Sequence, residues 1–173
     1  MALTTYTAGE VLTAASLNDN FTFAAANPGS SVVQVKSTTV TASTFSTTSA
    51  TLVDITGLSV SITPTSASNK VLVMATVSCG ISNAGDLVFL TLARDGTAIG
   101  GGVDATIMGE ARTTDRSYNF STQFLDSPAT TSATTYNVRA LANASIYTFY
   151  LNRRAASDAY RAISTITVME VTP

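Results

Sequence analysis

The clearest strand pattern in this 173-residue chain is residues 118–124, YNFSTQF. Aromatic and threonine side chains alternate there with polar ones, and this period of two is typical of a strand with one buried face. The turn-forming residues 126–128, Asp-Ser-Pro, follow directly, and proline cannot donate to a strand ladder. The stretch therefore predicts a strand whose aromatic face belongs to a core, with Tyr118, Phe120 and Phe124 inside.

Similar short patterns, separated by turn signals, extend on both sides of this strand to cover residues 31–173. The pair Asp95-Gly96 suits a two-residue hairpin turn, because both positions tolerate positive φ. No convincing helical period interrupts the series. We expect eight or nine strands and a jelly-roll-like antiparallel β-sandwich, an all-β fold. The predicted strands include residues 58–62, 71–79, 87–93, 98–99, 118–124, 134–141, 145–151 and 161–171.

Residues 71–79, VLVMATVSC, are apolar on both faces in their first half. Val71 and Val73 share one face, whereas Leu72 and Met74 occupy the other. Such a strand is central or is covered by a partner chain. Cys79 ends the run and is expected to be an inert part of the core.

The composition excludes several function classes. The chain has no His and one Cys, which rules out His-dependent catalysis, a cystine framework and a zinc cluster of the usual ligands. A net charge of -2 makes nucleic-acid binding unexpected, because the phosphate backbone attracts basic proteins. Residues 71–79 are half the length of a membrane span, so no membrane insertion is expected. We expect no enzyme activity and no cofactor.

The N-terminal residues 7–21 have the only helical features. Thr13 can cap a helix, and Leu17 and Phe21 are spaced i, i+4. A helix of about two turns is marginal in water, so its apolar side chains must dock on another surface. We expect docking through Val11, Leu12, Leu17 and Phe21. Residues 24–30, AAANPGS, suggest a linker that ends near Ser30, which divides the chain into a docking segment, 1–30, and the sandwich, 31–173.

Four of the nine basic residues lie between residues 139 and 161, a stretch of the C-terminal third that has a single acid, Asp158. A charge cluster is usually a solvated face, but forked arginine hydrogen bonds also suit a neighbouring subunit, a carboxylate-rich partner or an acidic sugar. Aromatic residues between 147 and 160 suit either packing or sugar stacking. The candidate partner-binding residues are Arg139, Arg153, Arg154 and Arg161.

Charged residues are scarce: they make up 12% of the chain, whereas Thr and Ser number 30 and 20. About 25% is usual for soluble domains, and surface charge keeps sheets from associating. We therefore expect a homo-oligomer held together by sheet faces, with closed cyclic symmetry.

Residues 6–18, YTAGEVLTAASLN, are similar to an N-terminal segment of many tailed-bacteriophage structural proteins. Residues 89–97, 125–131 and 164–170 resemble a β-sandwich module that is common in phage virion proteins. The resemblance implies a virion component that is assembled in the host cytoplasm. It also implies a homotrimer with a jelly-roll fold, docked through its N-terminal segment on the major capsid protein or on another virion protein.

Only residues 21–30 separate the docking segment from the sandwich, which is too short for the shaft of a long fibre. We therefore expect a noncatalytic capsid decoration (cement) protein or a short head fibre. The alternative is a tail fibre or adaptor module that binds a host receptor or another tail protein. A glycan-cleaving enzyme is a third class, which no carboxylate spacing supports.

Overall fold

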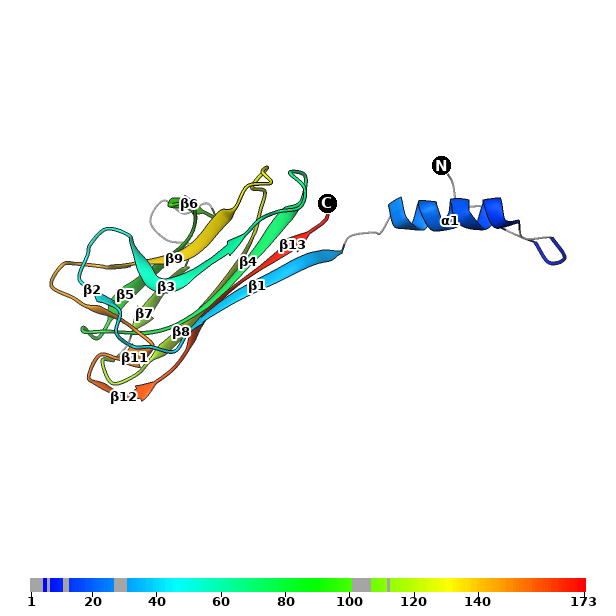
Figure 1. Cartoon of the computed structure of the whole chain (residues 1–173). Coiled ribbons are helices and arrows are strands. Elements are labelled where there is room, and N and C mark those ends of the chain that lie inside the picture. Colours follow the sequence, from blue (N-terminus) through cyan, green and yellow to red (C-terminus); the bar gives the residue numbers. More distant parts are fainter. Residues whose placement is uncertain (1–4, 6, 11–12, 27–30, 101–106, 112) are drawn as a thin grey trace.

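The computed structural model describes residues 5, 7–10, 13–26, 31–100, 107–111 and 113–173, and shows one helix followed by an antiparallel β-sandwich (Figure 1). The predicted all-β fold class is confirmed. The elements are α1 Ala14–Ala26, β1 Val32–Val40, β2 Ser46–Thr47, β3 Val53–Ile62, β4 Lys70–Ile81, β5 Asp86–Arg94, β6 Thr97–Ile99, β7 Ile107–Ala111, β8 Tyr118–Asp126, β9 Thr134–Ala142, β10 Phe149–Leu151, β11 Arg153–Arg154, β12 Ser157–Arg161 and β13 Ser164–Val171.

Two sheets form the sandwich. The first has the order β1-β13-β4, with β8 on the other edge of β4, and the short strands β10 and β2 continue it at one end. The second has the order β3-β9-β5, and β6 and β7 both pair with β5. Counted along the chain, the eight long strands therefore follow the orders 1-8-3-6 and 2-7-4-5. This interleaving of two Greek keys is the arrangement of a jelly roll.

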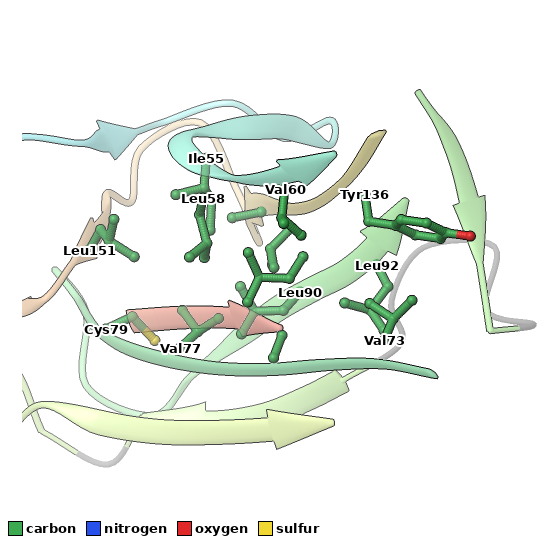
Figure 2. Close-up of a cluster of buried hydrophobic side chains, with 14 of the residues drawn as sticks. Ile55, Leu58, Val60, Val73, Val77, Cys79, Leu90, Leu92, Tyr136 and Leu151 are labelled. Atoms are coloured by element: carbon green, nitrogen blue, oxygen red, sulfur yellow. The ribbon is translucent and has the colours of Figure 1, made fainter. Parts of the chain in front are cut away.

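The core lies between the two sheets, where alternate residues of facing strands meet (Figure 2). Leu58 and Val60 of β3 face Val77 and Cys79 of β4, and Leu90 of β5 packs between the sheets. All of these side chains are buried. Cys79 is enclosed as expected, and burial raises the pKa of its thiol well above the usual range.

Strand β8 confirms the alternation that residues 118–124 predict. Its aromatic side chains pack against the core, while the intervening polar ones are exposed. The predicted hairpin turn is also present, with φ of 48° at Asp95 and 81° at Gly96. The Asp95 carboxylate accepts a hydrogen bond from the backbone N–H of Thr135, at 2.8 Å, which ties this turn to β9.

The structure corrects three predicted boundaries. Residues 145–148 are not a strand, because the Tyr147 N–H bonds to the Ala144 carbonyl at 2.9 Å in a turn between β9 and β10. The predicted strand 161–171 is interrupted after β12, and Ser164 begins β13. Helix α1 continues to Ala26, through alanines expected to be linker, because alanine has the highest helix propensity. The expected boundary near Ser30 lies outside the described residues.

Candidate interaction surfaces

Helix α1 has an N-cap and exposed apolar side chains. The Thr13 hydroxyl accepts a hydrogen bond from the backbone N–H of Ser16 at 3.2 Å, as the sequence predicts. The exposed fractions of Leu17 and Phe21 are 37% and 64%, and α1 lies apart from the sandwich (Figure 1). Of the four expected docking residues, Val11 and Leu12 lie outside the described residues. The other two are therefore free for contact with another surface.

The outer face of the first sheet is a second uncovered surface. Strand pairing aligns Leu125 of β8, Leu72 of β4, Met169 of β13 and Val35 of β1 in one apolar row across four strands. Two further rows continue the same face. We define the outer face as these three rows: Leu125, Leu72, Met169 and Val35; Gln123, Met74, Thr167 and Ser37; Ser121, Thr76, Thr165 and Thr39.

None of these twelve side chains is charged, and none is buried. Hydroxyls pair across strands instead, as between Thr76 and Ser121 at 3.0 Å and between Ser37 and Thr167 at 2.8 Å. The expectation for residues 71–79 is met, since β4 is central and its Leu72 and Met74 lie on the face away from the core. Within these three rows nothing repels a second sheet; the nearest charge on the same face is that of Lys70, which is exposed two residues before Leu72 on β4.

A third surface is formed by β11 and β12, which we call the arginine hairpin, residues 153–161. Arg153 lies directly opposite Arg161 in the strand pairing. The Arg153 guanidinium lies 4.0 Å from the ring centre of Tyr150, and that of Arg154 lies 4.5 Å from the ring centre of Tyr160. These are cation–π contacts. Three of the four arginines predicted to bind a partner are therefore brought together.

Arg139 is the exception, and its expected place in the cluster is wrong. It lies on β9 in the second sheet, where its Nε is 3.0 Å from an Asp54 carboxylate oxygen. Its Nη2 donates to the Leu52 carbonyl at 2.9 Å, and its Nη1 donates to the Gly96 carbonyl at 3.3 Å. These contacts engage the guanidinium within its own domain. Arg139 therefore has a structural role, although only 22 residues separate it from Arg161 along the chain.

The aromatic residues of the same region divide between packing and exposure. Phe149 is buried and packs edge-on against Phe45, with ring centres 6.3 Å apart. Tyr147 is partly buried against the core. Tyr160 is 67% exposed on the arginine hairpin. Only Tyr150 and Tyr160 therefore belong to the hairpin surface.

Two buried carboxylates are structural ties. Asp126 of β8 binds Nη1 of Arg94 at 2.7 Å and accepts a hydrogen bond from the hydroxyl of Tyr136 at 2.7 Å, which joins the first sheet to β5 and β9 of the second. Burial and the bond to Asp126 raise the pKa of Tyr136 well above its usual range. Both Asp126 oxygens and the Tyr136 hydroxyl have partners in this network, so it stabilises the sandwich.

Glu170 of β13 is the second tie, and its side chain is fully buried. Its carboxylate accepts hydrogen bonds from Asn69 and Gln34, both at 2.6 Å, and from the backbone N–H and hydroxyl of Thr65, at 2.7 and 2.8 Å. Burial opposes ionisation, but these four donors outweigh it and lower the pKa of Glu170 to about 2. The carboxylate holds the 64–69 turn and β1 against β13.

Sequence reasoning did not find the outer-face row. Its members come from four strands that are far apart in the sequence, and only the register aligns them. The one signal in the sequence was the apolar character of both faces of residues 71–79.

Among the described residues, no helix is long and apolar enough to cross a bilayer. Comparison with protein-family models and with curated proteins finds no match for this sequence.

Proposed function

We propose that the protein is a noncatalytic structural component of a tailed-bacteriophage virion, either a capsid decoration (cement) protein or a short head fibre. Its N-terminal segment docks on the major capsid protein or another virion protein, and its β-sandwich assembles with copies of itself, as a trimer. The observation that carries this proposal is that Leu17 and Phe21 are exposed on a helix that stands apart from the sandwich.

Docking by α1 follows from the energetics of burial. Fully burying a leucine or phenylalanine side chain stabilises a contact by about 1.5–3 kcal/mol. Two such side chains give a weak contact for one copy. Joined copies that bind neighbouring sites gain avidity without any new contact. A helix with few apolar anchors is therefore adequate for a component present in many symmetric copies.

The outer face supports self-association. With strands about 4.8 Å apart and alternate residues about 6.8 Å apart, twelve side chains cover about 400 Å². A stable interface usually buries about 800 Å² on each partner. A pair joined by this face alone would fall short of that area. In a closed ring each copy contacts two neighbours through two different patches, so in a trimer this face would supply one of the two contact patches of each copy.

The test measures how much of each full-length variant is found in purified particles when the variant replaces the wild-type gene. Leu17→Ser combined with Phe21→Ser should greatly reduce the amount of the protein in purified particles, because both apolar anchors are lost. Ile146→Ser is the matched control, since Ile146 is 78% exposed on the sandwich. Unchanged incorporation of the double variant would contradict docking through α1.

The alternative, a tail fibre or adaptor module, is favoured by one observation. Val32 of β1 pairs with Val171, whereas Val40 pairs with Ser164, just after the arginine hairpin. At about 3.3 Å per residue, the hairpin lies about 26 Å from the point where the N-terminal segment enters the sandwich. A chain anchored by α1 would present the hairpin at its far end.

The two functions differ in what the purified chain binds. A decoration protein should bind capsids from which it has been stripped, and should not reduce phage adsorption to host cells. A receptor-binding module should compete with phage for adsorption.

A further inference from the structure

The arginine hairpin holds two like charges at one place. Arg153 and Arg161 are direct cross-strand partners, so their side chains leave the same face of the hairpin, and like charges in this position destabilise a strand pair. Asp158 lies 3.9 Å from Arg161, but both side chains are more than half exposed, and such a pair contributes little. Arg153 forms no ion pair with any residue that the structure describes. A carboxylate from outside would relieve this repulsion.

The hairpin is held in place without such a ligand. A Cβ at Gly80 of β4 would lie 2.7 Å from the Arg153 carbonyl oxygen, so the absence of a side chain there lets the hairpin pack closely on the sheet. The Ala156 N–H bonds to the Thr114 carbonyl at 3.2 Å, and Arg154 Nη1 donates to the Asp115 carbonyl at 3.2 Å. The arginines are therefore positioned before a partner arrives, which lowers the entropy lost on binding.

The charge of this region has the opposite sign to that of the whole chain. The hairpin and the 113–116 loop that contacts it carry four arginines and two aspartates, which is a net charge of +2, whereas the chain carries -2. This local field attracts an acidic partner. Binding of a continuous phosphate backbone calls for basic side chains along its length, whereas the positive charge here is confined to one hairpin and the loop beside it.

Apolar exposure distinguishes a polypeptide partner from a sugar. Tyr160, which contacts Arg154, is 67% exposed, and Ile163, two residues after Arg161 in the chain, is 56% exposed. Arginine and tyrosine are the residue types that supply much of the binding energy of protein interfaces. An exposed isoleucine gains from contact with another apolar side chain, whereas a saccharide offers mainly hydroxyl groups.

We infer that the arginine hairpin binds an acidic polypeptide segment of another protein. Carboxylates of that segment pair with Arg153 and Arg161, and an apolar side chain of the segment covers Ile163. This site is separate from α1 and does not depend on docking through the N-terminal segment.

The test measures binding of the full-length protein to a fluorescein-labelled peptide AEELEEA by fluorescence anisotropy, with AQQLQQA as the uncharged match. The acidic peptide should bind, and its Kd should rise about fivefold to tenfold for Arg153→Gln and for Arg161→Gln, the size of one partly screened charge-assisted bond. Ile163→Ser should weaken binding of both peptides. Lys36→Gln removes one exposed positive charge on β1 and should leave the Kd unchanged.

Three results would overturn the inference. Equal binding of the two peptides would remove the role of the carboxylates. An equal loss with Lys36→Gln would show general charge attraction. Binding of tri-galacturonate, with no binding of the peptide at the same concentration, would assign the site to an acidic sugar. A thermal unfolding midpoint within about 2 °C of the wild type would show, for each variant, that the sandwich is intact. Arg153→Lys provides a second variant, which keeps the positive charge but loses the forked hydrogen bonds of the guanidinium.

Discussion

Replacing Glu170 by Gln should destabilise the sandwich and remove much of its sensitivity to acid. The carboxylate accepts four hydrogen bonds in a fully buried position. In Glu170→Gln an NH₂ group takes the place of one carboxylate oxygen. Asn69 and Gln34 donate to different oxygens, so at least one donor would then face another donor, and the charge that strengthens all four bonds would be lost.

The magnitude follows from the pKa of Glu170, which is about 2 in the folded protein and 4.5 in the reference state. A shift of one unit corresponds to about 1.4 kcal/mol, so ionisation of this side chain contributes about 3 kcal/mol to the free energy of unfolding. Because the folded pKa is the lower one, the unfolded state binds the proton first. The contribution is therefore complete above about pH 5.5 and is lost as the pH falls from 4.5 to 2.

The assay is urea unfolding between pH 3 and 8 at one protein concentration, followed by circular dichroism because the chain has no tryptophan. Glu170→Gln should lower the free energy of unfolding by about 3 kcal/mol at pH 7 and flatten its decline below pH 5. The exposed Glu110 of β7 provides the control, since Glu110→Gln should change the free energy of unfolding by less than about 0.5 kcal/mol. A loss below about 1 kcal/mol, or an unchanged acid slope, would refute the reasoning.

Three further changes test the fold and the assembly. Tyr136→Phe removes the hydroxyl that donates to Asp126 and should cost about 1–2 kcal/mol in the same urea assay; a neutral effect would contradict a structural tie. Gly80→Ala places a methyl group 2.7 Å from the Arg153 carbonyl oxygen, so hydrogen exchange of residues 153–161 should accelerate, and unchanged protection would argue against the close approach. Leu125→Glu puts a charge on the outer face and should shift the protein to a smaller species in sedimentation velocity, whereas an unchanged sedimentation coefficient would exclude this face from the assembly.

Much of the fold could be predicted because it depends on local patterns. The alternation in residues 118–124 identifies the buried and exposed faces of β8 without knowledge of any neighbour. The Asp95-Gly96 turn is equally local, since positive φ is a property of two adjacent residues. Thr13 could be recognised as a cap for the same reason. Boundaries were less predictable, as at residues 145–148, where a turn closed by the Tyr147 N–H and the Ala144 carbonyl replaces the expected strand.

The candidate surfaces depend on register, which sequence spacing does not contain. Arg139 and Arg161 are close in sequence, but β9 and β12 belong to different sheets, so one arginine is enclosed by its own fold and the other is exposed. Glu170 shows the same limit. Its place on the inward face could be inferred from the alternation of β13, but its donors come from residues 34, 65 and 69, more than 100 positions away.

The amino-acid sequence alone determined that this protein is an all-β sandwich with a short capped helix, because the period of a strand and the chemistry of turns and caps act over a few neighbouring residues. The tertiary structure decided which side chains meet. Pairing β8, β4, β13 and β1 in one register created the uncharged outer face, and folding β11 onto β12 placed two arginines opposite each other. Those arrangements are set by hydrogen bonding between distant strands, and their surfaces exist only once the sheets have formed.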